Sequence, residues 1–128
     1  MESCTAFIKR KNEQFAKESM ISMKDIGRKG KHHFKREAWT FMPQYNMDKK
    51  VFVFERLRMV KTDGEVAYQN TIQDDIEYRI GYYIVGQIGN RKNIWTWGQF
   101  CPMIPQNDFE RLIGKARKEG VILNNIKH

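Results

Sequence analysis

The segment from Tyr78 to Phe100 constrains the fold of this chain more than any other part of the sequence. Two runs rich in aromatic and β-branched residues flank the short basic loop 89–93, a pattern typical of a β-hairpin. Apolar side chains occupy both faces of this hairpin. A sheet of this kind is either covered on both sides or binds something on its second side.

Pairing Ile88 with Ile94 across the loop sets an expected register for the hairpin. The facing pairs under this register are Val85–Trp97, Gln87–Trp95 and Tyr83–Gln99. The two indoles then share a face with Arg79. They could form a stacking platform for nucleic-acid bases, and the alternative is that they lie in the core beneath a helix.

The remaining elements follow from the same kind of pattern. An amphipathic helix is predicted over 106–119, where the four residues Phe109, Leu112, Ile113 and Ala116 form an apolar stripe that ends before Gly120. An N-terminal helix is expected within 3–26, from helix-favouring residue types and a loose apolar stripe. Strands are expected over 33–42, 51–60 and 65–72, the last two joined by an Asp-Gly turn.

The sequence therefore predicts a single α+β domain, residues 1–128. An antiparallel sheet of four to five strands, built from two hairpins, packs against the C-terminal helix and an N-terminal helix. In residues 51–60, alternation places Val51, Val53, Leu57 and Met59 on one face. Glu55, next to arginines in this strand, is interpreted as an ion-pair residue.

The positive charge is concentrated near the N-terminus. The chain has a net charge of +8, and residues 9–36 hold ten Lys/Arg and three Asp/Glu, which is ten minus three, or +7. The segment 1–36 is therefore interpreted as a basic N-terminal segment, part of which could be mobile. Such a field attracts polyanions, of which nucleic acid is the commonest.

These patterns favour a small basic nucleic-acid-binding accessory protein without enzymatic activity. The basic segment would contact phosphates and the tryptophan hairpin would stack bases. The candidate binding residues are Arg28, Lys29, Lys31, Lys35, Arg36, Arg79, Arg91, Lys92, Trp95, Trp97 and Tyr83. The alternative is a module for a small nucleotide-like anionic ligand, or for protein interaction, with homo-oligomer formation as one form of it.

A metal-dependent nuclease is a further alternative, with Asp74, Asp75 and Glu77 as the carboxylates. No Asp…Glu-x-Lys arrangement accompanies them, and the spacing of serines, histidines and aspartates indicates no Ser-His-Asp group. No cofactor and no catalytic or metal-ligating residue is assigned. Two cysteines and the lack of a long apolar run favour a cytoplasmic protein without membrane contact.

Overall fold

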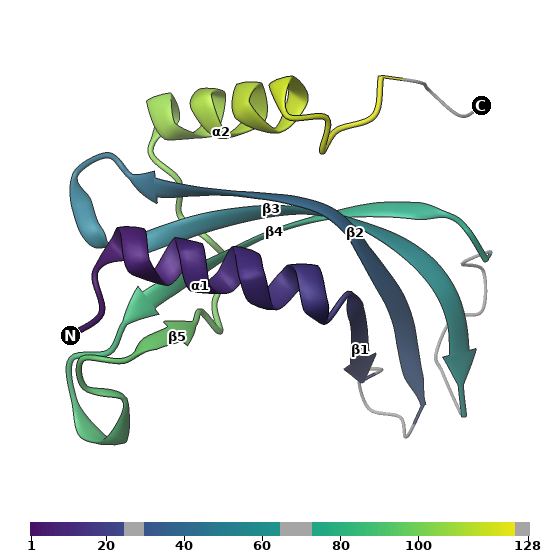
Figure 1. The fold of residues 1–128 in the computed structure, drawn as a ribbon, viewed down its shortest axis with the longest axis horizontal. Coiled ribbons are helices and arrows are strands. Elements are labelled where there is room, and N and C mark those ends of the chain that lie inside the picture. The colour runs from purple at the N-terminus through teal and green to yellow at the C-terminus, as the bar shows by residue number, and fades with distance from the viewer. Residues whose placement is uncertain (25–29, 65–72, 125–128) are drawn as a thin grey trace.

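The computed structural model of the chain describes residues 1–24, 30–64 and 73–124. The elements within them are α1 (Cys4–Lys17), β1 (Met20–Lys24), β2 (Lys31–Gln44), β3 (Met47–Asp63), β4 (Ile76–Val85), the 3-10 turn η1 (Gly89–Arg91), β5 (Trp95–Trp97) and α2 (Gln106–Lys118). The strands form one antiparallel sheet in the order β1-β2-β3-β4-β5. Figure 1 shows α1 and α2 on opposite sides of this curved sheet. The predicted α+β fold is confirmed.

Helix α1 packs on one side of the sheet, which we call the α1 face. Its side chains Phe7 and Phe15 are buried against residues of β2–β5, namely Phe41, Val51, Val53, Tyr83, Val85 and Trp95. Ser3 caps the helix, because its Oγ accepts a hydrogen bond from the N–H of Ala6 at 3.1 Å. The indole of Trp95 donates to the main-chain oxygen of Glu2 at 2.9 Å, which fixes the start of the helix to β5.

Helix α2 covers the opposite side, the α2 face. Leu112 and Ala116 of this helix are buried together with Phe52 and Phe54 of β3 and with Val121. The alternation predicted for residues 51–60 is therefore confirmed. Phe109 was expected in the stripe, but its side chain is 45% exposed, and Asp108 is buried instead. The carboxylate of Asp108 accepts a hydrogen bond from the N–H of Tyr45, which explains why a charged residue faces inward.

The N-terminal helix is shorter than predicted. It ends at Lys17, and β1 follows over Met20–Lys24, within the range 3–26 expected to be helical. Beyond Lys17 the inward-facing apolar residues are Ile21 and Met23, two positions apart, and both pack against the buried cluster at the far end of β3. Apolar residues that recur at every second position indicate a strand. Over residues 3–26 the apolar positions also fit a helical spacing loosely, so the change from helix to strand could not be located from the sequence.

The hairpin of β4 and β5 has a wider connection than predicted. Its facing pairs are Tyr83–Trp97, Ile84–Thr96 and Val85–Trp95, a shift of two residues from the expected register. The turn η1 and a bridge between Gly86 and Lys92 occupy the space where Ile88 was expected to face Ile94. Because the shift is even, each side chain keeps its predicted face. The strand expected over 65–72 lies outside the described residues, and β3 pairs with β2 and β4.

Replacement of Leu112 by Ala is expected to lower the free energy of unfolding by about 2–5 kcal/mol, because the fully buried side chain leaves a cavity between α2 and the sheet. Urea denaturation measures this loss. Phe109→Ala on the same helix is the control and should cost less than half as much. Equal losses for the two variants would contradict the observed docking of α2.

Candidate functional site: a cationic and aromatic cluster on the α1 face

A buried carboxylate lies at the centre of the α1 face. Glu55 of β3 is fully buried, and its two oxygens contact an arginine from each neighbouring strand. Nε of Arg36 on β2 lies 2.6 Å from Oε2, and Nε of Arg79 on β4 lies 2.8 Å from Oε1. A carboxylate can be buried in this way because charge-assisted hydrogen bonds replace its lost hydration. The prediction that Glu55 forms ion pairs agrees with these contacts.

Each of the two arginines also packs on an aromatic ring. The guanidinium of Arg36 lies 3.5 Å from the ring centre of Phe15 on α1. That of Arg79 lies 5.1 Å from the ring centre of Trp97 on β5. Cation–π contacts of this kind stabilise both partners and fix the orientation of the guanidinium plane. The side chain of Arg79 is 29% exposed, so its positive charge also contributes to the electrostatic potential at the surface.

Trp97 is held flat against β4 by the absence of a side chain at Gly81. A Cβ atom at Gly81 would lie 2.2 Å from the indole, closer than any real contact. The Tyr83 ring meets the indole edge-on, with centroids 5.0 Å apart. Trp97 is nevertheless 38% exposed, so it presents an aromatic surface to solvent beside Arg79.

Lys11 adds a third cation from α1. Its Nζ lies 4.9 Å from the ring centre of Tyr83 and donates a hydrogen bond to Oε1 of Gln14. Burial, and then the nearby guanidinium of Arg10, lowers the pKa of Lys11 below its usual range. Burial also raises the pKa of the Tyr83 hydroxyl.

We call these six side chains the Glu55 cluster: Lys11, Arg36, Glu55, Arg79, Tyr83 and Trp97. Three of them are cationic and one is a carboxylate, so the cluster carries a surplus of two positive charges at neutral pH. Among the described residues, Arg36 and Arg79 form their ion pairs with Glu55, and Lys11 forms no ion pair. A local surplus of positive charge beside an exposed indole is suited to an anion that carries a planar group.

Two of the predicted stacking residues are not accessible. Trp95 is 7% exposed, because its ring stacks on Phe7 with centroids 4.5 Å apart. Tyr83 is also buried, between Phe7, Phe41 and Trp97. Both indoles and Tyr83 therefore do not form one open platform, and for Trp95 and Tyr83 the alternative, burial in the core, is the observed one. Of these three side chains, only Trp97 keeps an exposed surface.

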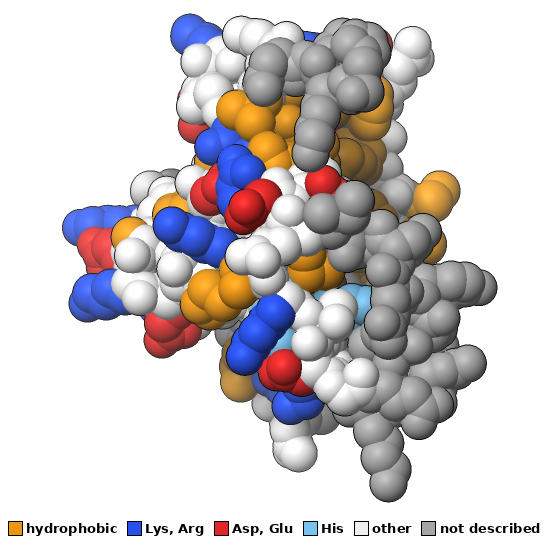
Figure 2. Space-filling view, turned by 90° about the vertical axis from the view of Figure 1, so that its right-hand side faces the viewer, with side chains coloured by type: hydrophobic (Ala, Val, Ile, Leu, Met, Phe, Trp, Pro, Cys, Tyr) orange, Lys and Arg blue, Asp and Glu red, His pale blue; other side chains and the backbone are white. Residues whose placement is uncertain are grey.

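The predicted basic residues do not form one arm. Lys31 pairs with Asp63 at one end of β3, whereas Arg91 and Lys92 lie in the hairpin loop beyond Lys50 at the other end. Lys31, Lys35, Arg91 and Lys92 are all exposed. Arg28 and Lys29 lie outside the described residues. Figure 2 shows Lys and Arg next to Asp and Glu on the side where β2 begins, so the described side chains there form no continuous cationic surface.

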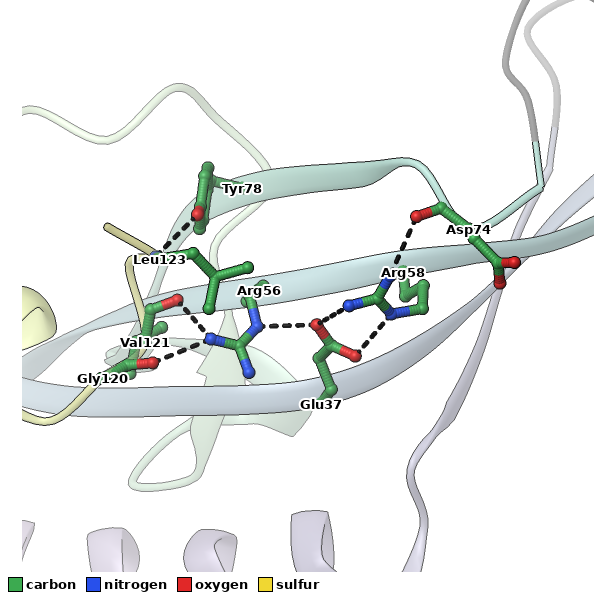
Figure 3. Close-up of polar contacts among 8 residues, drawn as sticks. All are labelled: Glu37, Arg56, Arg58, Asp74, Tyr78, Gly120, Val121 and Leu123. Carbon is green, nitrogen blue, oxygen red and sulfur yellow. Dashed lines mark hydrogen bonds and ion pairs between the residues drawn. The ribbon is translucent and has the colours of Figure 1, made fainter. Parts of the chain in front are cut away.

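A second carboxylate that is bound by two arginines, that of Glu37, lies on the α2 face (Figure 3). Glu37 accepts hydrogen bonds from Arg56 and Arg58, and Nη1 of Arg56 also donates to the main-chain oxygens of Gly120 and Val121. These contacts fasten the end of α2 to the sheet. The hydrogen bond from Arg58, the largest influence, lowers the pKa of Glu37 below its usual 4.5.

The suggested metal site is not supported. Asp74, Asp75 and Glu77 all lie in the described part of the chain, in which no group of three His, Cys, Asp or Glu side chains could hold a metal ion. The main-chain oxygen of Asp74 instead accepts a hydrogen bond from Arg58. No helix among the described residues is both long and apolar enough to cross a bilayer.

Sequence reasoning named Arg36, Arg79, Tyr83 and Trp97, and the structure brings these four residues together. It did not assign Lys11 to the site, because a lysine in a basic helix carries no local signal. Comparison with protein-family models, with curated proteins and with solved structures gave no match. The functional interpretation therefore depends on the geometry of the cluster.

Replacement of Glu55 by Gln is expected to lower the free energy of unfolding by about 3–5 kcal/mol, because two partly buried guanidinium groups lose their counter-charge. Guanidinium chloride or urea denaturation at neutral pH measures this loss. Glu37→Gln is the matched control, since that carboxylate is also bracketed by two arginines but is less buried. A smaller loss for Glu55→Gln than for Glu37→Gln would contradict the central role of Glu55.

The free energy of unfolding is expected to decrease at low pH, in part because Glu37 becomes protonated. A carboxyl whose pKa is lowered in the folded state stabilises the protein above its usual value of 4.5, and this contribution is lost as the pH falls through the folded-state pKa. Urea midpoints measured from pH 6 down to about pH 2 should therefore fall less steeply in Glu37→Gln than in the unmodified protein. Parallel curves would exclude a contribution from this group.

Proposed function

We propose that this protein binds a nucleotide unit, an aromatic base next to a phosphate, at the Glu55 cluster. The observation that carries the proposal is the exposed indole of Trp97, which Gly81 holds flat on β4 beside Arg79. Stacking of a base on an aromatic side chain contributes about 1–3 kcal/mol. The adjacent guanidinium supplies the charge and the hydrogen-bond donors that a phosphate requires.

The charge of the cluster supports an anionic ligand. Glu55 neutralises only one of the two arginines, and Lys11 lies within contact of the Tyr83 ring without a carboxylate partner among the described residues. Burial of uncompensated positive charge is unfavourable in the free protein. An incoming phosphate would offset this cost, so binding is favoured by the charges that the fold already holds close together.

The nucleotide unit could be a free nucleotide or part of a single-stranded nucleic acid. The exposed cations Lys31, Lys35, Arg91 and Lys92 are not part of the cluster and could contact further phosphates of a longer chain. A cytoplasmic location agrees with either ligand, and with the two free cysteines Cys4 and Cys101. A binding experiment with ligands of different length distinguishes a free nucleotide from a single-stranded nucleic acid.

Fluorescence anisotropy with a labelled mononucleotide and a labelled single-stranded 12-mer tests this proposal. Trp97→Ala should weaken binding by about 10-fold or more, because the stacking surface is lost. Gly81→Ala should weaken it similarly, since a methyl group there displaces the indole. Tighter binding of the 12-mer, with an affinity that falls as salt rises, identifies the nucleic acid as the source. Equal binding of both probes identifies the free nucleotide.

Gly114→Ala is the matched control for the glycine variant. Gly114 lies in α2, and a Cβ atom there meets nothing within 4 Å, so the ligand affinity should not change. Binding of neither probe, or unchanged binding by Trp97→Ala with the fold intact, would refute the proposal.

A further inference from the structure

Three polar side chains from adjacent strands lie in line near the outer edge of the sheet. Oγ of Ser22 on β1 lies 2.7 Å from Nδ1 of His33 on β2. Nε2 of His33 lies 2.8 Å from Oδ2 of Asp63 on β3. The spacing in the sequence indicated no Ser-His-Asp group, but antiparallel pairing brings these three residues together.

The pairing of β1 with β2 explains the short contact. Ser22 and His33 are direct partners, and the N–H of Arg36 donates to the oxygen of Ser19 three residues away in the same register. Because hydrogen-bonded and non-hydrogen-bonded pairs alternate, Ser22 and His33 form a non-hydrogen-bonded pair, whose side chains lie closer together. For the same reason the main-chain N–H of Ser22 points away from β2, toward the outer edge of β1.

We propose that Ser22 is a nucleophile for acyl-group transfer and that His33 is its general base. Nδ1 of His33 is placed to accept the hydroxyl proton of Ser22 when Nε2 carries the ring proton. The outward N–H of Ser22 is placed to donate to the oxyanion that forms on the acyl carbon. The substrate class is an acyl ester that approaches along the edge of β1, which pairs only with β2 among the described residues.

The proposed step conserves protons and electron pairs. Oγ of Ser22 forms a bond to the acyl carbon while its proton passes to Nδ1 of His33. The bond to the leaving alkoxide then breaks, and Nδ1 returns the proton to that oxygen. Water repeats the sequence, so that the acid is released and the serine hydroxyl is restored.

Asp63 is a positioning residue in this arrangement. Its carboxylate lies 2.8 Å from Nε2 but off the N–H direction, so the contact acts through charge and becomes an ion pair once the ring is protonated. The negative charge stabilises the imidazolium that forms during transfer. Lys61, whose Nζ lies 3.7 Å from the same carboxylate, moderates this effect.

The site is open to a reagent from solvent. Ser22 is exposed, and the side chain of His33 is 18% exposed. Accessibility of both the nucleophile and the base is required for the proposed reaction.

A fluorophosphonate probe tests the proposal on the full chain. In this reaction Oγ bonds to phosphorus, fluoride leaves and the hydroxyl proton passes to solvent through the histidine. We expect Ser22 to be labelled, as mapped by mass spectrometry against the other two serines, Ser3 and Ser19. Ser22→Ala should abolish labelling, His33→Gln should slow it by about 100-fold or more, and Ser19→Ala should leave it unchanged.

The role of Asp63 requires a measurement that a simple loss of structure would not change. In Asp63→Asn the labelling rate should fall while the far-UV circular dichroism stays unchanged, and Asp63→Glu, which keeps the charge, should restore the rate, because the carboxylate stabilises the imidazolium that forms during transfer. Wild-type protein that is not labelled would overturn the proposal. Labelling of Ser22 at the wild-type rate in His33→Gln would overturn it as well. Neither result depends on the Glu55 cluster, so this proposal and the binding proposal can fail separately.

Discussion

A fully buried carboxylate shared by three strands is the interaction on which the α1 face depends. Arg36 on β2 and Arg79 on β4 can both reach Glu55 only in the observed register. A slip of one residue in β3 would turn Glu55 to the α2 face and leave two arginines without a partner. Removing either side of such a group leaves an uncompensated buried charge. The ion pairs therefore select one alignment of β2, β3 and β4.

The lengths of the elements explain why part of the α1 face stays open. A helix of 14 residues spans about 21 Å, whereas a strand of 17 residues spans about 55 Å even before it bends. Helix α1 therefore covers only part of this face. Phe7 lies over Trp95 and buries it, while Trp97, two positions along the same strand, remains 38% exposed. The two indoles, for which the sequence predicted the same environment, therefore differ in their exposure to solvent.

Alternation and helical period were sufficient for much of the fold. They assigned both faces of β3 and the bounds of α2, because each depends on residues close in sequence. They missed the end of α1, where the apolar spacing of a helix changes to that of a strand between Lys17 and Met20. They also misplaced the register of β4 with β5 by two residues, since the 3-10 turn after Ile88 has no distinct sequence signal. Contacts such as Arg36–Glu55–Arg79 required the alignment of three strands, including the register shift between Arg36 and Ala38 of β2, which no local pattern specifies.

The positions of the charged side chains in the structure change the interpretation of residues 9–36 as one cationic segment. Ten Lys/Arg in residues 9–36 suggested one cationic segment. Those of them that lie in the described residues are divided among α1, β1 and β2, and Arg10 and Arg36 are paired with Glu2 and Glu55. Paired charges contribute little to a long-range field, because each carboxylate cancels its partner. The positive charge of Lys11, whose Nζ lies over the ring of Tyr83, and that of Arg79, which lies over the indole of Trp97, are placed by the fold. The proposed binding of an anion therefore depends on where the fold places a few charges, and not on the net charge of the chain.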